Sequence, residues 1–205
     1  MIKKNAYFAI KRAFDFTVAL IGLIIFSPLF VITCILIKID DPEGGSFFVQ
    51  ERYGKDRKLF RMYKFRTMHV NAEDMIDNLL DMNEADGPAF KIKDDPRITR
   101  IGGFLRKTHI DELPQLFNVL KGEMSLVGPR PPLPREVKRY NEWHYHKLDA
   151  KQGMTCYWQV ADKRNEIPFD EWIALDLKYI KEQSILTDIK ILLKTIGVVL
   201  KMNGM

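Results

Sequence analysis

Two adjacent carboxylates, Asp111 and Glu112, are the residues whose types and spacing best suit chemistry in this sequence. Five bases lie near them in the sequence: Arg97, Arg100, Arg106, Lys107 and Arg130. Carboxylate oxygens can bind Mg²⁺ while arginines bind phosphate oxygens, and a carboxylate beside cations stays ionised, as a nucleophile must. Pro129 and Pro131 restrict the backbone that presents Arg130. The pair is therefore a candidate catalytic and metal site for phosphoryl chemistry.

A structural role explains the same two carboxylates. Thr108 suits the N-cap of a helix that runs to about Leu120 and ends at Gly122. Acidic residues in the first turn complement the helix dipole, and the spacing Thr-x-x-Asp resembles a capping box. The residues alone leave the catalytic and the capping interpretations open.

Composition excludes several classes of protein. Of the 205 residues, 46% are hydrophobic and 29% are charged, which argues for one globular domain and against disorder. The chain has two cysteines, Cys34 and Cys156, and four histidines without an HExxH spacing. This excludes a disulfide framework and a structural zinc site.

The positive charge lies in two blocks. Residues 47–70 and 87–140 each carry a net charge of +5, whereas residues 71–86 hold six acids and no base. Because the whole chain has a net charge of only +5, this clustering is more informative than the total. It predicts that part of the protein binds an anionic ligand or surface.

An apolar segment of 22 residues without a charge, 16–37, precedes these blocks. About 20 such residues suffice for a membrane-spanning helix, and the flanking bases favour spanning. Ser27-Pro28 in its centre predicts a kink, which leaves two arms of about 18 Å. Each arm is too short to cross a core of about 30 Å but can enter one leaflet. The residues leave spanning and re-entry open.

The remaining patterns predict a helix-rich α+β fold. Short strands are expected at residues 46–50 and 58–65 around a turn at Gly54. Further helices are expected at 71–86, 168–182 and 187–202. The helix at 71–86 is acidic and amphipathic, with its apolar residues on an inner side. Together these elements form one compact domain attached to the apolar segment.

Seven motifs that occur in order resemble one known family. They are Lys11-Arg12-x-Phe14-Asp15, Ser27-Pro28, Lys64-Phe65-Arg66-Thr67-Met68, Asp95-Pro96-Arg97-Ile98-Thr99, Leu105-Arg106-Lys107, the run from Asp111-Glu112-Leu113-Pro114-Gln115 to Ser125, and Val127-Gly128-Pro129-Arg130-Pro131. Together they resemble the bacterial sugar transferase family, the small monotopic phosphoglycosyl transferases that start glycan assembly on a polyprenol. The similarity runs from about Lys11 to Leu193.

The resemblance implies transfer of a sugar 1-phosphate from a UDP-sugar to polyprenyl (undecaprenyl) phosphate, with release of UMP. This is the first membrane step in the assembly of a bacterial exopolysaccharide, capsule or O-antigen. Asp111 would be the nucleophile that forms a covalent phosphosugar intermediate, and Glu112 its metal or proton-handling partner with Mg²⁺. The implied substrate-binding residues are Lys64, Arg66, Arg97, Arg106, Pro129, Arg130 and Pro131. For Lys64 and Arg66 a solvated basic strand is the alternative.

The resemblance also implies a membrane topology. Residues 1–40 would form a re-entrant helix broken at Ser27 and Pro28, held in one leaflet of the bacterial inner membrane. Residues 41–205 would form the catalytic domain on the cytoplasmic face. The resemblance implies no nucleic-acid partner and leaves a homodimer open. We expect the chain to lack the additional transmembrane bundle of larger relatives.

The final predicted helix, 187–202, suits this topology. Its lysines Lys190, Lys194 and Lys201 fall within an arc of about 40°, and apolar residues cover most of the rest. A core helix with one solvated edge is one interpretation. We favour an amphipathic helix that lies in the membrane surface, because a re-entrant anchor would already hold the domain there.

One residue departs from the family pattern. Cys156 stands where a glycine is usual, so a turn that requires positive φ would be strained or rebuilt there. Tyr157 and Trp158 follow it and suit either stacking on a sugar or uracil, or packing in the core. Two functions of other classes use the same sequence features: a Mg²⁺-dependent lipid diphosphate phosphatase, and a bitopic membrane protein that binds anionic lipid.

Overall fold

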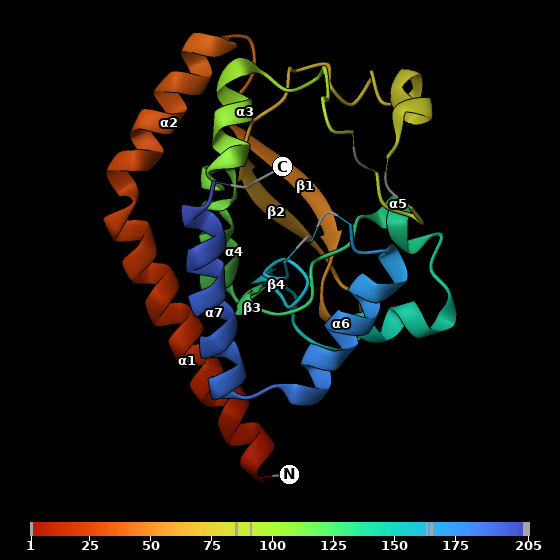
Figure 1. Ribbon diagram of the computed structural model, residues 1–205. Helices are drawn as coiled ribbons and strands as arrows, with labels where there is room; N and C mark the ends of the chain where they lie inside the picture. Colours follow the sequence, from red (N-terminus) through yellow and green to blue (C-terminus); the bar gives the residue numbers. More distant parts are fainter. Residues whose placement is uncertain (1, 85, 91, 163, 165, 203–205) are drawn as a thin grey trace.

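The computed structural model describes residues 2–84, 86–90, 92–162, 164 and 166–202 (Figure 1). Within them the α-helices are α1 (Ile2–Ile25), α2 (Ser27–Asp40), α3 (Arg100–Lys107), α4 (Gln115–Lys121), α5 (Pro134–Val137), α6 (Phe169–Glu182) and α7 (Ile185–Leu200). The strands are β1 (Phe47–Tyr53), β2 (Leu59–Phe65), β3 (Ser125–Val127) and β4 (Gly153–Thr155). The helix-rich α+β prediction is confirmed.

The apolar segment folds as two helices, α1 and α2, that are bent by 60° relative to each other. The break lies at Phe26, and Pro28 occupies the first turn of α2, where its missing N–H leaves no helical bond unmade. The break predicted at Ser27-Pro28 is therefore confirmed. No single described helix is long and apolar enough to cross a membrane, whereas the bent pair together reaches that length and composition.

The predicted hairpin is confirmed. Strands β1 and β2 pair in antiparallel fashion, with Phe47 opposite Phe65 and Tyr53 opposite Leu59. A second pair, β3 and β4, is parallel and was not expected from the sequence. Its strands approach closely because Gly153 has no side chain: a Cβ there would lie 2.1 Å from the Gly128 backbone nitrogen. This contact brings the segment after β3 close to β4.

The short helix α4 lies at the centre of the main core. Its Val119 is fully buried with Ala19 of α1, Met62 of β2 and Tyr179 of α6. The guanidinium of Arg12 donates to the carbonyl oxygens of the last turn of α4, Val119 and Leu120, at 2.6 and 2.7 Å. Helix α1 thereby holds the element that follows Asp111 and Glu112 in the chain.

The acidic helix predicted at residues 71–86 is wrong. The segment forms turns and a single 3₁₀ helix, η2 (Asp77–Met82), which buries only Leu79 and leaves Leu80 and Met82 about half exposed. Acids at Glu73, Asp77 and Asp81 would repel each other at i,i+4 spacing on an α-helix. Few buried apolar contacts offset that repulsion, so the α-helix does not form.

The helix predicted to start at Thr108 is also wrong. Thr108 ends α3, where its hydroxyl donates to the Phe104 carbonyl oxygen at 2.9 Å. The two acids lie in a short 3₁₀ turn, η3 (Ile110–Glu112), and α4 begins only after Pro114. Pro114 has no N–H to donate to the carbonyl oxygen of Ile110, so one continuous α-helix cannot pass through it. The capping-box interpretation therefore fails, while the helix end at Gly122 is confirmed by its φ of +82°.

The helices expected at 168–182 and 187–202 are confirmed as α6 and α7. Helix α7 lies beside α1, and its buried Asp188 accepts hydrogen bonds from Tyr7 and Lys11 at 3.0 and 2.8 Å (Figure 1). Its other side is open: Leu193 and Leu200 are exposed together with the lysines. Helix α7 thus has one core face and one exposed face that is both apolar and basic.

Candidate active site

A cleft of about 980 Å³ lies between the hairpin, η3 and the loop that follows β3. Asp111 and Glu112 line it, and so do the side chains of Lys64, Arg106 and Arg130. Residues that are far apart in the sequence therefore meet in one basic cavity. Its size suits an organic ligand with charged groups.

The backbone before the two acids is tightly constrained. His109 has φ of +58°, a left-handed conformation that is uncommon for a residue other than glycine. It separates the end of α3 from η3 and so turns both carboxylates into the cleft. Lys64 on β2 forms an ion pair with Glu112, with 2.8 Å between Nζ and Oε1. Hairpin and turn are thereby joined at the site.

The two carboxyl groups differ in their electrostatic surroundings. Burial, together with the neighbouring Glu112, raises the pKa of Asp111 to about 6 against the opposing effect of Lys64 and Arg106. Burial alone would also raise the pKa of Glu112, but Lys64, Arg130 and His109 together lower it to about 2. Glu112 is thus a fixed anion, whereas Asp111 is a buried, weakly neutralised carboxylate at neutral pH.

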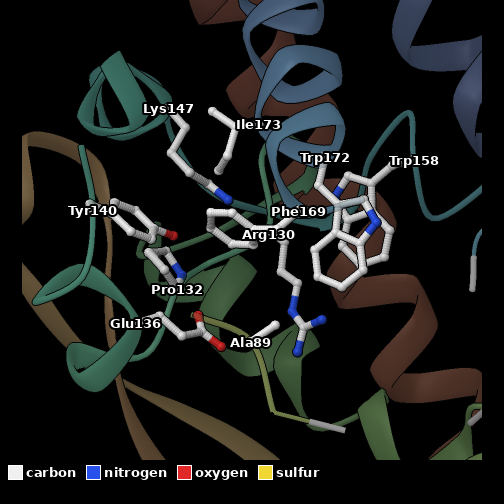
Figure 2. Close-up of a pocket in the computed structure, with 10 residues that line it drawn as sticks. All are labelled: Ala89, Arg130, Pro132, Glu136, Tyr140, Lys147, Trp158, Phe169, Trp172 and Ile173. Carbon is white, nitrogen blue, oxygen red and sulfur yellow. The ribbon is translucent and has the colours of Figure 1, made fainter. Parts of the chain in front are cut away.

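The loop after β3 presents Arg130. Its flanking prolines are fixed through their carbonyl oxygens: Pro129 accepts from the Gly153 N–H at 2.9 Å, and Pro131 accepts from Arg52 at 2.9 Å. The Arg130 guanidinium lies 5.7 Å from the ring centroid of Trp158. Figure 2 shows this side chain beside the rings of Trp158 and Trp172, at a small cavity of about 20 Å³ next to the main cleft.

Trp158 is a largely buried residue that lines the site. It is 3% exposed and stacks on Trp172, with 4.5 Å between ring centroids and 12° between the planes. One face is therefore occupied within the protein, which favours the core interpretation for its ring. Cys156 is buried and is not among the described residues with positive φ, so the expected backbone strain is absent. Its thiol donates to the Gln159 side-chain oxygen at 3.2 Å.

Arg106 reaches the site from the last turn of α3. Its Nε donates to the Thr67 hydroxyl at 2.9 Å, and burial lowers its pKa. Helix α3 can approach the segment after β2 so closely because Gly102 lies against its backbone: a Cβ there would be 2.0 Å from the Thr67 carbonyl oxygen. Arg106 thus has a neutral hydrogen-bond partner, and Asp111 is the carboxylate that most opposes the lowering of its pKa by burial.

Two other arginines predicted to bind substrate also line the cleft but already have acidic partners. Arg66 forms an ion pair with Asp41 at 2.8 Å and donates to the Gly45 carbonyl oxygen at 2.7 Å. Arg97 makes a two-pronged contact with Asp95, at 2.9 Å through Nε and 2.7 Å through Nη2. Arg66 thereby joins the end of β2 to the loop after α2. The Arg97–Asp95 contact lies within one turn, and Arg97 reaches another segment through Nη1, which donates to the Ala72 carbonyl oxygen at 3.5 Å.

Two lining residues were missed in the sequence. Arg52 on β1 is buried at the cleft, and His109 lies next to the acids with its Nε2 buried and without a hydrogen-bond partner in the described structure. The alternation of β1 predicts only which side Arg52 faces. The dipeptide His109-Ile110 carries no signal for a left-handed residue, so neither role could be predicted.

The donor set fits Mg²⁺ on chemical grounds. Mg²⁺ prefers oxygen ligands and is usually held by one or two carboxylates together with substrate phosphates. Asp111 and Glu112 supply two carboxylates at one place, and the described part of the chain has no group of three or more His, Cys, Asp or Glu side chains that could together hold a metal ion. The residues thus suit an ion shared with a phosphate ligand rather than a closed protein cage.

The chain is similar to known proteins, several of which are named as sugar transferases. A family model described as bacterial sugar transferase matches residues 6–202. The chain is 47% identical over 202 residues to galactosyl transferase CpsE of Streptococcus agalactiae, which covers 98% of this chain and 44% of that protein. It is 43% identical over 209 residues to undecaprenyl-phosphate galactose phosphotransferase of Salmonella typhimurium, covering 100% and 43%.

A third relative is of similar length. The chain is 38% identical over 199 residues to the exopolysaccharide production protein ExoY of Sinorhizobium fredii, which covers 95% of this chain and 87% of that protein. The chain thus spans less than half the length of the first two relatives and most of the third.

Proposed function

This chain belongs to the bacterial sugar transferase family, and from the geometry of its cleft we propose that it is a phosphoglycosyl transferase. The proposed reaction transfers a sugar 1-phosphate from a UDP-sugar to undecaprenyl phosphate and releases UMP. The observation that carries the proposal is the buried Asp111, set beside Glu112 in a cleft that Lys64, Arg106 and Arg130 make basic.

We propose that the reaction proceeds in two displacements at phosphorus. An Asp111 carboxylate oxygen attacks the β-phosphorus of the UDP-sugar, the bond to the bridging oxygen breaks, and UMP leaves with the electron pair. An oxygen of undecaprenyl phosphate then attacks the phosphorus of the aspartyl phosphosugar and restores the Asp111 carboxylate. No proton is gained or lost overall, so the protein needs to stabilise charge rather than move protons.

The charges around Asp111 suit these steps. Burial leaves the carboxylate poorly solvated, which favours its attack on phosphorus, while Arg106 and Lys64 keep part of it ionised. Arg130 is placed to bind phosphate oxygens, and guanidinium groups do this with paired N–H donors. Mg²⁺, which Asp111 and Glu112 would hold, supplies further positive charge to the diphosphate.

The membrane arrangement is also a proposal. Along α1 and α2 the residues nearest the bend expose their apolar side chains; Ile24, Ile25 and Val31 are each more than 60% exposed. We propose that this bent pair enters one leaflet of the bacterial inner membrane and returns, which leaves the cleft on the cytoplasmic face. An acceptor carried on a polyprenol would then reach the cleft from the membrane surface.

An assay of UMP release tests the reaction. The purified protein in detergent with Mg²⁺ is supplied with UDP-galactose, UDP-glucose or UDP-N-acetylgalactosamine, each with and without undecaprenyl phosphate. We expect multiple turnovers of UMP release with at least one donor and only in the presence of the acceptor. Continuous turnover without the acceptor would indicate a phosphatase that uses water. Absence of UMP with every donor, or an equal rate in an Asp111→Asn variant, would contradict the proposal.

A further inference from the structure

Arg52 is a buried cation at the end of β1 that the reaction described above does not use. It is 5% exposed and lines the same cleft as Asp111. Its Nε and Nη2 both donate to the side-chain oxygen of Gln50, at 3.1 and 2.7 Å, and its Nη1 donates to the Pro131 carbonyl oxygen at 2.9 Å. The guanidinium is thus held rigidly under the loop that carries Arg130.

The partners of Arg52 are neutral. Among the described residues no carboxylate lies within 4 Å of its guanidinium, although other arginines of the chain, Arg66 and Arg97, do have such partners. Burial of a charge without a counter-ion is unfavourable, and a fold that tolerates it usually has a reason. A carboxylate in place of the Gln50 amide would satisfy the same N–H groups and neutralise the charge, yet the chain has glutamine.

The neighbouring charges indicate what is missing. Burial, followed by repulsion from Arg130, lowers the pKa of Arg52 to about 9 against the weaker attraction of Glu136 and Glu112. Two guanidinium groups therefore repel each other at one wall of the cleft. An anion bound between them would relieve this repulsion. Each Nη atom of Arg52 also carries a second N–H beyond the one that it donates to Gln50 or Pro131.

We propose that Arg52 and Arg130 together form a subsite for a substrate phosphate, and that Gln50 is the neutral partner that orients Arg52 without cancelling its charge. This inference rests on the proposed transferase function. The ligand chemistry is a phosphate group, which two substrates carry: the diphosphate of the UDP-sugar and the phosphate of the polyprenol. The two half-reactions distinguish these sources.

The sharpest variant is Gln50→Glu. It keeps an oxygen acceptor of the same size for Arg52 but places a counter-charge on it, so the fold should be at least as stable. If Arg52 binds phosphate, the rate of the affected half-reaction should fall about tenfold or more in the variant, because a charged hydrogen bond to substrate is weakened. Gln183→Glu, which changes the net charge equally at the C-cap of α6, should retain wild-type rates.

The measurement separates the steps. UMP released in a single turnover without the acceptor reports on the UDP-sugar, and transfer from the preformed phosphosugar enzyme to undecaprenyl phosphate reports on the acceptor. A loss in either half-reaction, with an unchanged or raised Tm, supports the subsite and identifies its phosphate. Wild-type rates in both half-reactions for Gln50→Glu would overturn it and leave Arg52 a structural residue. Inactivity of the wild-type protein would instead contradict the transferase function itself.

Discussion

The arginines around the cleft occupy two regions with different electrostatics. Arg66 follows β2 and Arg97 precedes α3, and each forms an ion pair with a carboxylate, Asp41 or Asp95. Arg106 and Arg130 lie beside the acids of η3; a hydroxyl and an aromatic ring are the partners found for them in the described structure. The first region is neutralised within the protein, and the second is not.

This difference distinguishes arginines that stabilise the fold from arginines whose charge is available to a ligand. A guanidinium that is paired with a buried carboxylate fixes the two segments that it joins, but its charge contributes little beyond them. A guanidinium with neutral partners keeps its charge available to a ligand, at a cost in stability. All four arginines belong to basic motifs of the same sequence, so we propose that the partner, rather than the residue type, distinguishes those that contact substrate.

The largest effect should follow from Asp111→Asn, which removes the proposed nucleophile. We expect kcat to fall on the order of 10³-fold or more. Because burial raises the folded-state pKa of Asp111, its ionised form costs stability above that pKa. The variant should therefore be more stable at pH 7, by about 1–3 kcal/mol, and this gain should disappear below about pH 4. UMP release and thermal unfolding measure both effects.

Exposed Asp149 provides the matched control for that variant. Asp149→Asn should leave both kcat and Tm unchanged. An Asp111→Asn variant that loses stability along with activity would indicate a structural role for the carboxylate.

The next effect tests the unneutralised arginines directly. Arg130→Gln should lower kcat/KM for the UDP-sugar about 10- to 100-fold, because a charged hydrogen bond to phosphate is lost. The Tm should change little, since no acidic partner is left behind. Exposed Arg139→Gln is the control and should behave as wild type. A large drop in Tm for Arg130→Gln with normal kinetics would indicate that Arg130 stabilises the fold, as Arg66 and Arg97 do, and does not bind substrate.

The pH dependence should reflect Asp111. With its pKa raised to about 6, the carboxylate is ionised and reactive above that pH and protonated below it. The rate of UMP release in the first half-reaction should therefore be flat from about pH 7 upward and fall about tenfold for each unit below 6. Single-turnover rates between pH 4.5 and 8 test this, with Tm followed to exclude unfolding. A rate that rises as the pH falls would contradict the assignment.

Basic residues outside the cleft sharpen the comparison. Lys190 and Lys194 on α7 and Lys201 at its C-cap are exposed, so lack of an acidic partner costs them little. Each near an anionic leaflet should add about 1 kcal/mol of attraction. Replacing all three with Glu should reduce activity several-fold on liposomes that contain anionic lipid, and hardly at all in neutral detergent. Equal loss in both settings would contradict the surface role of α7.

The smallest effect on activity belongs to the neutralised region. Asp41→Asn leaves the buried Arg66 without its counter-ion, which should lower the free energy of unfolding by about 3 kcal/mol. Assayed well below its Tm, the variant should keep kcat/KM within about twofold of wild type, because Arg66 does not contact substrate in this account. A specific loss of kcat/KM in a fully folded variant would contradict the distinction between arginines that are paired with carboxylates and arginines that bind substrate.

Local signals predicted much of the fold. The break at Pro28 and the αL end of α4 at Gly122 each depend on a residue whose conformational preference is strong by itself. The turn after Gly54 is at the predicted place, but its residues with positive φ are Asp56 and Arg57. The predictions failed where contacts or charges beyond the immediate sequence neighbours determine the structure. Residues 71–86 have a helical apolar period, but like charges on one face prevent the helix. The β3–β4 pair depends on a contact between glycines that are distant in sequence.

The sequence predicted which residues line the site, but not which of its arginines are paired with carboxylates. Asp111, Glu112 and Arg130 line one cleft as expected. The pairing of Arg66 with Asp41 joins residues 25 positions apart and has no sequence signal. Arg52 was missed because strand alternation indicates burial but not whether a buried charge has a counter-ion.

The central claim is that Asp111 carries the sugar phosphate, and mass spectrometry of the enzyme after reaction with donor alone tests it most directly. The wild-type protein is mixed with a UDP-sugar and Mg²⁺ without undecaprenyl phosphate, quenched in acid and digested. We expect one phosphosugar per chain, on the peptide that contains Asp111, together with release of one equivalent of UMP. The Asp111→Asn variant should form no adduct. Release of UMP without an adduct, or an adduct on a different residue, would contradict it.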